Sequence, residues 1–219
     1  MTPLLQAESL YRFYHAGDDE TLALQGVSLA VEAGELVAVT GPSGSGKSTL
    51  LACLAGLDEP TAGMVRIAGH RLSRRPEAER AALRASSIGM LFQSANLVEH
   101  LDVTENVQLA QRLAGRKDRS DAVALIARVG LTARARARPS ELSGGELARA
   151  GLAVALANDP PVLLADEPTG ELDGVTAERV LGLLRDRARA GVAVVVVTHN
   201  PAVAADADRT IALADGRVV

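Results

Sequence analysis

The chain has 219 residues, 47% of them hydrophobic, with a formal net charge of −4 and a pI near 5.6. This length suits one large domain with a substantial hydrophobic core. The longest apolar run, Val192 to Val197, is far too short to cross a bilayer. The N-terminus shows no basic region followed by an apolar core, so we expect no signal peptide and a cytoplasmic location. The acidic balance and the 2% aromatic content argue against nucleic acid as a partner.

The chain begins with short strand-like segments that turn residues separate. Leu4–Leu10, Leu22–Val31 and Leu36–Val39 alternate or concentrate apolar side chains, and acidic or glycine-containing turns lie between them. We therefore expect a small antiparallel β region that leads into a buried strand.

Three of the four Phe and Tyr residues gather at Tyr11, Phe13 and Tyr14. One interpretation is a strand that packs its rings. The other is a ring that stacks on the base of a bound nucleotide, because a planar base needs a planar partner. Tyr14 is the expected stacking residue, and Tyr11 or Phe13 are the alternatives.

A glycine-rich stretch follows and has the pattern G-x-x-x-x-G-K-[ST] between a predicted strand and a predicted helix, Ser48–Leu57. Its glycines allow backbone N–H groups to turn inward, and the helix start adds the positive end of a dipole. Lys47 supplies a charge for the outer phosphates, and the Ser48 hydroxyl suits Mg²⁺. The sequence predicts a nucleoside triphosphate site rather than a turn that binds nothing. The binding residues that we expect are Gly41, Pro42, Ser43, Gly44, Ser45, Gly46, Lys47, Ser48 and Thr49.

The middle of the chain is mostly helical by composition. Arg71–Ala85 is charged and favours a helix, and Ile88–Phe92 is a short apolar strand with Gln93 at its end. Residues from about 94 to 155 favour helices, with breaks at Gly115, Gly130 and Pro139. This range predicts an inserted α-helical subdomain.

Ser143, Gly144, Gly145 and Glu146 stand at the start of one of these helices. Ser143 and Glu146 have the spacing of a capping box, which gives them a structural explanation. The two glycines are not explained by it, because glycine weakens a first turn unless the backbone must approach something closely. A second anion-binding helix start is the alternative.

Two buried strands end in residues that suit phosphate chemistry. The strand that begins at Pro161 ends in Asp166 and Glu167, and a parallel strand places its carboxyl end at a ligand crevice. Asp166 can hold Mg²⁺ through water, and Glu167 can orient the attacking water. His199 follows the strand Val192–Val197 and either caps it or acts on a phosphate or the attacking water.

These features together resemble a known family, the ATP-binding subunit of ABC transporters. The resemblance covers essentially the whole chain and implies an α/β P-loop NTPase of residues 1–219. Residues 1–93 and 156–219 would form a RecA-like core with an antiparallel β subdomain, and residues 94–155 the α-helical subdomain. It further implies ATP and Mg²⁺ as cofactors, a head-to-tail homodimer on ATP binding, and an integral membrane permease as partner. The subunit would then lie at the inner face of the cell membrane.

The resemblance also implies a role for each motif residue. Gly41 to Ser48 would be Walker A, Tyr14 the aromatic on adenine, and Gln93 the Q-loop residue, which acts in catalysis and on the metal. Ser143 to Glu146 would be the signature motif, which faces the ATP bound by the Walker A motif of the partner subunit. Asp166 would be the Walker B aspartate that serves the metal with Ser48, Glu167 the catalytic glutamate, Asp173 the D-loop aspartate and His199 the switch histidine.

Within the family, the run Leu-Ala-Asp-Glu-Pro-Thr-Gly-Glu-Leu-Asp looks like one branch. That branch contains lipoprotein-release, macrolide-export, antimicrobial-peptide-resistance and cell-division ATPases. The resemblance thus implies a subunit that hydrolyses ATP to power a permease of the mechanotransmission or export type. The alternative is a soluble ABC ATPase acting in DNA repair or on ribosomes. The chain departs from the common pattern at Glu146, Val154 and Asn200, where glutamine, arginine and aspartate are common.

Overall fold

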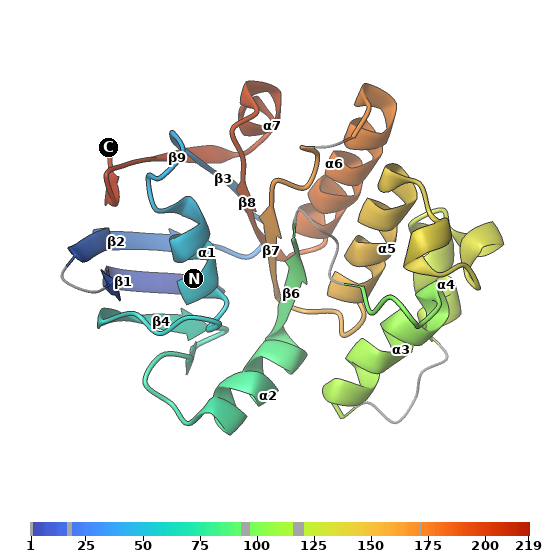
Figure 1. The fold of residues 1–219 in the computed structure, drawn as a ribbon, viewed down its shortest axis with the longest axis horizontal. Helices are drawn as coiled ribbons and strands as arrows, with labels where there is room; N and C mark the ends of the chain where they lie inside the picture. Colours follow the sequence, from blue (N-terminus) through green and yellow to red (C-terminus); the bar gives the residue numbers. More distant parts are fainter. Residues whose placement is uncertain (1, 17–18, 93–96, 116–120, 171) are drawn as a thin grey trace.

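The computed structural model describes residues 2–16, 19–92, 97–115, 121–170 and 172–219. Two β-sheets and a group of helices make up this part of the chain (Figure 1). The first sheet is antiparallel in the order β2-β1-β4-β5. Its strands are β1 (Leu5–Ala16), β2 (Asp19–Val31), β4 (Ala62–Ile67) and β5 (His70–Arg71).

The second sheet has the order β10-β9-β3-β8-β7-β6. All its neighbouring strands are parallel except β10, which pairs antiparallel with β9. Its central strands are almost entirely apolar, as expected for parallel strands that are covered on both faces. The strands are β3 (Leu36–Thr40), β6 (Ile88–Leu91), β7 (Val162–Asp166), β8 (Ala193–Val197), β9 (Arg209–Ala214) and β10 (Arg217–Val218).

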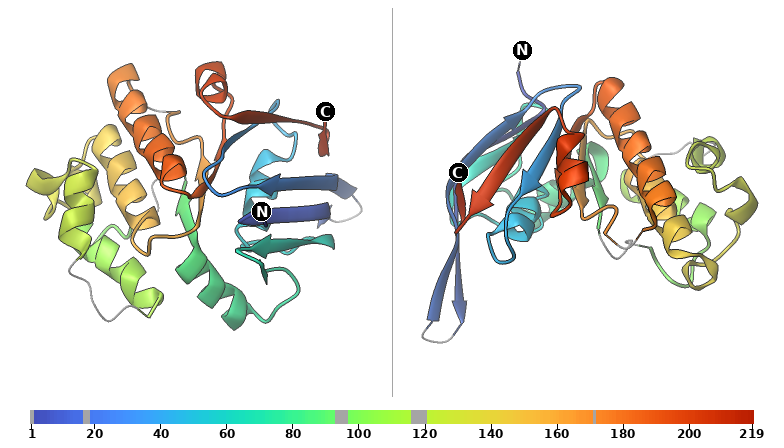
Figure 2. Two further views of the ribbon diagram at one scale, coloured as in Figure 1. Left: turned by 180° about the vertical axis from the view of Figure 1, so that it is seen from behind. Right: turned by 90° about the horizontal axis from the view of Figure 1, so that it is seen from above.

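Helices cover both faces of the second sheet. Helix α1 packs on one face, in an apolar cluster shared with the first sheet, and helices α3 to α6 contribute to a second cluster on the other face. The views of Figure 2 place the helices of residues 103–155 at the far end of the molecule from the antiparallel sheet. The helices are α1 (Lys47–Leu54), α2 (Glu77–Ser87), α3 (Val103–Leu113), α4 (Asp121–Arg128), α5 (Gly144–Ala155), α6 (Gly174–Arg189) and α7 (Pro201–Ala205).

The predicted β region and the buried strands are confirmed, but several boundaries are wrong, including the start of the second strand, which is Asp19 rather than Leu22. The first strand continues to Ala16, so the cluster of aromatic residues lies within β1. The first helix ends at Leu54 because the chain turns at Gly56, which has φ 65°. The helix expected from Arg71 begins only at Glu77, after Pro76, because residues before it form β5 and a turn in which Arg74 has φ 56°.

The described residues between 97 and 155 form helices and turns without a strand. Helices α3, α4 and α5 pack on one another, and α5 also packs against β6, the edge strand of the second sheet. The expected start of the helical subdomain at residue 94 lies outside the described residues, and its expected end at residue 155 coincides with the end of α5, so the bounds 94–155 remain a proposal. No helix in the described ranges has both the length and the apolar character needed to cross a membrane.

Candidate functional site

Three neighbouring parallel strands bring the predicted motif residues together. Val39 of β3 and Asp166 of β7 are both paired with Val197 of β8, so the three strands end at one edge of the sheet. Two further backbone bonds join the segments that follow: Thr198 N–H donates to the Val39 carbonyl at 3.0 Å, and Glu167 N–H to the Val197 carbonyl at 2.9 Å. The phosphate loop, the two carboxylates and His199 thus leave the sheet side by side.

The phosphate loop requires glycine because other backbone segments approach it closely. Gly41 has φ 148°, and a Cβ there would lie 2.2 Å from the carbonyl oxygen of Leu213. Gly46 has φ 98°, and a Cβ there would lie 2.4 Å from the carbonyl oxygen of Ala23. Strands β2 and β9 therefore hold the loop from outside, and a side chain at either glycine would displace backbone.

The N-terminus of helix α1 is suited to an anion. Gly46 precedes it without any side-chain cap, so the first N–H groups have no acceptor from a capping side chain. The ammonium group of Lys47 donates to the carbonyl oxygens of Gly41 at 2.8 Å and Pro42 at 2.7 Å, which holds it over the loop. The Ser45 hydroxyl is buried within this loop and has no hydrogen-bond partner. These features fit a loop built to receive phosphate oxygens.

Glu167 is held in place by residues that follow β8. Its carboxylate accepts hydrogen bonds from Thr198 Oγ1 at 3.2 Å and from the His199 N–H at 3.0 Å, and its Oε1 lies 2.7 Å from His199 Nδ1. The backbone of Glu167 has φ 45°, in the left-handed region that costs free energy for a residue other than glycine. A strained, clamped carboxylate at this position supports a functional role for it.

Asp166 lies beside Glu167 at the end of β7 and is partly buried. Burial and then the nearby charge of Glu167 raise the pKa of Asp166, and Lys47 lowers it. A divalent cation in the cavity would stabilise the charged carboxylate, so the surroundings of Asp166 fit a metal ligand. Among the described residues, no three His, Cys, Asp or Glu side chains gather into a metal site.

The structure brings most of the predicted site residues into one cavity of about 560 Å³. The phosphate loop, Asp166, Glu167 and His199 meet there, and β2 and the turn between β9 and β10 complete its wall. The lining residues are Thr21, Leu22, Ala23, Gln25, Gly41, Ser43, Gly44, Gly46, Lys47, Ser48, Thr49, Asp166, Glu167, Val197, His199, Asp215 and Gly216.

Sequence reasoning missed the contributions of Thr198, of Asp215 and of four residues of β2, namely Thr21, Leu22, Ala23 and Gln25. Thr198 is fully buried and holds Glu167, and the others line the cavity. The apolar run Val192–Val197 is the only sequence signal for Thr198, which directly follows it. Because β8 pairs with β7, the Thr198 hydroxyl lies beside Glu167. No motif marks the remaining residues, because only the packing of distant strands brings them to the loop.

The expected signature residues do not line this cavity. Ser143 caps α5, its hydroxyl accepting from the Glu146 N–H at 3.3 Å, and the Glu146 carboxylate accepts from the Ser143 N–H at 2.8 Å. The capping-box interpretation is confirmed. A Cβ on Gly145 would lie 2.5 Å from Cγ2 of Thr176 in α6, whereas a Cβ on Gly144 would meet nothing within 4 Å. Packing on α6 therefore explains the glycine at position 145. It does not explain the glycine at position 144.

Tyr14 does not line the cavity either. Its hydroxyl donates to Asp58 Oδ2 at 2.6 Å, and the Arg12 guanidinium lies over its ring, 4.4 Å from the ring centroid. Burial and the bond to Asp58 raise the pKa of Tyr14, while Thr49 and Arg12 lower it. The residue is 38% exposed, so part of it is accessible to a ligand. Gln93 lies outside the described residues, and its expected role remains a prediction.

A phosphate loop after a parallel strand, with two carboxylates at the end of a nearby strand, defines a P-loop nucleoside triphosphatase. The family model described as "ABC transporter" matches residues 24–170, which is more than half of the chain. The chain therefore belongs to the ABC transporter family, as an ATPase of the ABC type with a P-loop core, an antiparallel sheet and a helical insert.

The chain is also similar to individual proteins. The "Macrolide export ATP-binding/permease protein MacB" of Burkholderia thailandensis is 44% identical over 220 residues, which are 99% of this chain and 34% of that protein. MacB 1 of Yersinia pestis bv. Antiqua is 42% identical over 222 residues, which are 100% of this chain and 34% of that protein. The chain thus spans about a third of the length of these curated relatives.

A solved structure has nearly the same fold. It is the dimeric, post-hydrolysis state of the ATP-binding cassette MJ0796 bound to ADP and Pi, with a TM-score of 0.91 and 37% identity. The match covers 98% of this chain and 96% of that chain. The structure of cbiO1 from Clostridium perfringens, part of the ABC transporter complex cbiONQ, matches with a TM-score of 0.85 and 25% identity over 100% of this chain and 88% of that chain.

Asp173, the expected D-loop aspartate, is the N-cap of α6. Its carboxylate accepts from the N–H groups of Val175 at 3.0 Å and Thr176 at 3.1 Å. The bonds to Thr176, and the smaller one to Val175, lower the pKa of Asp173. Because the folded-state pKa is depressed, the stability that the charged cap contributes is present above the ordinary pKa of Asp and is lost as pH falls through the lowered value.

We predict that Asp173→Ala lowers the melting temperature by about 2–4 °C at neutral pH, and that Asp173→Asn, which keeps a capping oxygen but not the charge, lowers it by less. The loss should shrink as the pH falls below the lowered pKa of Asp173. Thermal unfolding between pH 7 and pH 3 measures both. A loss of equal size for the two variants would show that capping is not what Asp173 contributes.

Proposed function

We propose that this chain binds MgATP in the cavity beside the phosphate loop and hydrolyses it to drive a membrane permease. The proposal rests on one observation. Four side chains line the same cavity at the uncapped N-terminus of α1, namely Lys47, Asp166, Glu167 and His199. In this proposal the loop N–H groups and Lys47 bind the β- and γ-phosphates.

Ser48 and Asp166 would hold Mg²⁺, with Gln93 as the further ligand that the family resemblance implies. Both described residues line the cavity, and Asp166 sits where burial and Glu167 make its negative charge unfavourable without a cation. The metal when bound supplies positive charge that neutralises the phosphates.

Glu167 would accept a hydrogen bond from the attacking water and orient it toward the γ-phosphate. Thr198 and His199 fix the carboxylate for that task through the bonds described above. Because His199 Nδ1 faces Glu167, its Nε2 is the nitrogen that would reach a phosphate oxygen. The exposed ring of Tyr14 would stack on the base.

A second copy of the chain would complete the site. Ser143 to Glu146 lie outside the cavity of their own chain, and Gly144 at the start of α5 is open. The similar cassette MJ0796 is dimeric. We therefore propose a head-to-tail homodimer in which the start of α5 of one copy faces the phosphates held by the other.

An apolar groove is the proposed docking surface for the permease. It has a volume of about 570 Å³, and its walls come from α2, β6, α3 and α5. Leu113, at the end of α3, is 72% exposed in it. Leu97, which follows Gln93 by four residues, packs against the apolar cluster on the helical side, so we do not include it in the docking surface.

The names of the relatives support a proposal for the kind of permease. They are named macrolide export ATP-binding/permease proteins and are about three times as long as this chain. We propose a permease of the export or mechanotransmission type that handles an antibiotic, lipoprotein or peptide, with this subunit peripheral at the inner face of the cell membrane. A soluble ABC ATPase of DNA repair or ribosomes is the less favoured function, because these export proteins match 99% or more of the chain.

The first test separates phosphate binding from chemistry. We expect Lys47→Ala to weaken ATP binding about 10- to 100-fold, because it removes charge-assisted hydrogen bonds to the phosphates. We expect Glu167→Gln to retain ATP binding while hydrolysis falls about 100-fold or more. Calorimetric titration and steady-state phosphate release give the two quantities. Undiminished hydrolysis by Glu167→Gln would remove Glu167 from the catalytic role.

The second test concerns the dimer. We expect ATP to convert the Glu167→Gln protein from monomer to dimer, and Ser143→Arg in the same background to prevent this by placing a bulky cation at the start of α5. Sedimentation velocity with and without ATP measures the two species. A Ser143→Arg protein that still dimerises would place the contact elsewhere.

The third test concerns the groove. We expect Leu113→Asp to leave folding and ATP binding intact, since the side chain is exposed, and to abolish co-purification with a membrane protein. Val123→Asp is the matched control, because Val123 is 68% exposed on α4 and does not line the groove. Equal effects of the two substitutions would argue against the groove as the docking site.

A further inference from the structure

Helix α2, one wall of the groove, is attached to the core by Leu83, which packs against the apolar cluster of the first sheet, and by charged side chains. None of its residues is fully buried, and its alanines line the groove, namely Ala78, Ala81, Ala82 and Ala85. The Arg80 and Arg84 side chains of the same helix are only 16% and 20% exposed, and Arg84 also lines the groove. Both pair with Glu77, Arg80 also pairs with Glu59, and Arg84 donates to the Gly56 carbonyl at 2.8 Å. Glu59 and Gly56 belong to the segment that follows α1.

The neighbour of Glu59 in sequence, Asp58, holds Tyr14. Its Oδ2 accepts from the Tyr14 hydroxyl at 2.6 Å and from Arg12 Nε at 2.8 Å. Burial alone would raise the pKa of Asp58, but the bonds from Tyr14 and Arg12 hold it below its ordinary value. Arg12 also covers one face of the Tyr14 ring. The position of the ring and the face left for a base are therefore set by Asp58 and Arg12 together.

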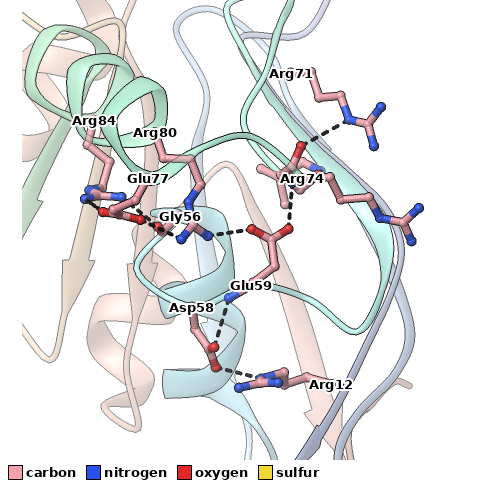
Figure 3. A network of polar contacts seen from close by, with 11 residues as sticks. Arg12, Gly56, Asp58, Glu59, Arg71, Arg74, Glu77, Arg80 and Arg84 are labelled. Atoms are coloured by element: carbon pink, nitrogen blue, oxygen red, sulfur yellow. Dashed lines mark hydrogen bonds and ion pairs between the residues drawn. The ribbon is translucent and has the colours of Figure 1, made fainter.

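Asp58 and Glu59 form one tight unit. The Glu59 N–H donates to Asp58 Oδ1 at 2.9 Å, and the Asp58 N–H donates to the Ala52 carbonyl of α1 at 3.1 Å. Glu59 Oε1 accepts from the Arg74 N–H at 2.7 Å. Figure 3 shows the resulting continuous chain of contacts from Arg12 through Asp58 and Glu59 to the arginines of α2.

We propose that Asp58 is a positioning residue for the base-stacking ring of Tyr14, and that the Asp58–Glu59 unit couples this ring to helix α2 and so to the groove. The inference rests on the proposed roles of Tyr14 and of the groove. A base that shifts the ring must act on Asp58, because a 2.6 Å hydrogen bond leaves little freedom between them. Coupling between two binding sites is reciprocal, so an occupant of the groove that moves α2 would alter base binding through the same unit.

The first experiment compares ATP with inorganic tripolyphosphate, which has no base. We expect Asp58→Asn and Tyr14→Phe each to weaken ATP binding about three- to tenfold and to leave tripolyphosphate binding unchanged, because only part of the stacking contribution is lost. Asp58→Asn replaces the charged acceptor of the Tyr14 hydroxyl by an uncharged one, and Tyr14→Phe removes the hydroxyl itself. Because both act on the same bond, the double variant should lose less affinity for ATP than the two single losses together. Tyr14→Phe keeps the ring and tests that bond even if Asp58→Asn does not fold. Arg75→Gln removes an exposed ion pair beside the same helix and is the control that should change neither affinity.

Equal weakening of ATP and tripolyphosphate by Asp58→Asn would overturn the positioning role and leave a general structural one. Tyr14→Ala separates this failure from failure of the proposed function. If Tyr14→Ala weakens ATP binding and Asp58→Asn does not, only the positioning role of Asp58 is wrong. If Tyr14→Ala also has no effect, the assignment of the base site itself is wrong.

The second experiment measures hydrogen exchange of the α2 backbone with and without ATP. We expect ATP to slow exchange in α2 of the unaltered chain, and this change to disappear in Glu59→Gln, which removes the charge that pairs with Arg80 while leaving Asp58 in place. Arg75→Gln should retain the response to ATP. An α2 that exchanges at the same rate with and without ATP, or a Glu59→Gln protein that responds like the unaltered chain, would overturn the coupling.

Discussion

The common edge at which β3, β8 and β7 end is the constraint on which the rest of the site depends. Parallel pairing aligns the three strand ends, and two more backbone bonds continue the alignment past them, from Thr198 to Val39 and from Glu167 to Val197. The phosphate loop, the carboxylates and the histidine share one cavity because of this register. A shift of one strand by a residue would turn its side chains to the other face and separate them.

The phosphate loop also depends on parts of the chain far from it. Its glycines lie against the carbonyl oxygens of Leu213 and Ala23, and Gly216 donates its N–H to the Ser45 carbonyl at 3.1 Å. The last strands and the antiparallel sheet therefore shape the loop from outside. Strand β9 and the turn before β10 therefore contribute to the shape of the proposed nucleotide site.

The helix starts of this protein differ in a way that separates their tasks. Helix α1 leaves its first N–H groups without a capping side chain, whereas α5 and α6 are capped by Ser143 and Asp173. At α5 the carboxylate of Glu146 adds a negative charge, and its bonds to the Ser143 N–H and hydroxyl lower its pKa. Arg134 lies 3.3 Å from this carboxylate and offsets part of its charge. In the proposed dimer, the open Gly144 is therefore the part of this capped helix start that a phosphate held by the second copy would approach.

The sequence by itself determined the class of the protein, the phosphate loop, the buried strands and the carboxylates, because each is a local pattern whose chemistry depends on neighbouring residues. The capping box from Ser143 to Glu146 was also evident, since its spacing lies within one helical turn. Only the tertiary structure decided that Gly145 packs on Thr176, that Thr198 clamps Glu167, and that Asp58 holds Tyr14. Those contacts join residues about 30 or more positions apart, and no local propensity encodes them. They form only when the sheets and helices have packed.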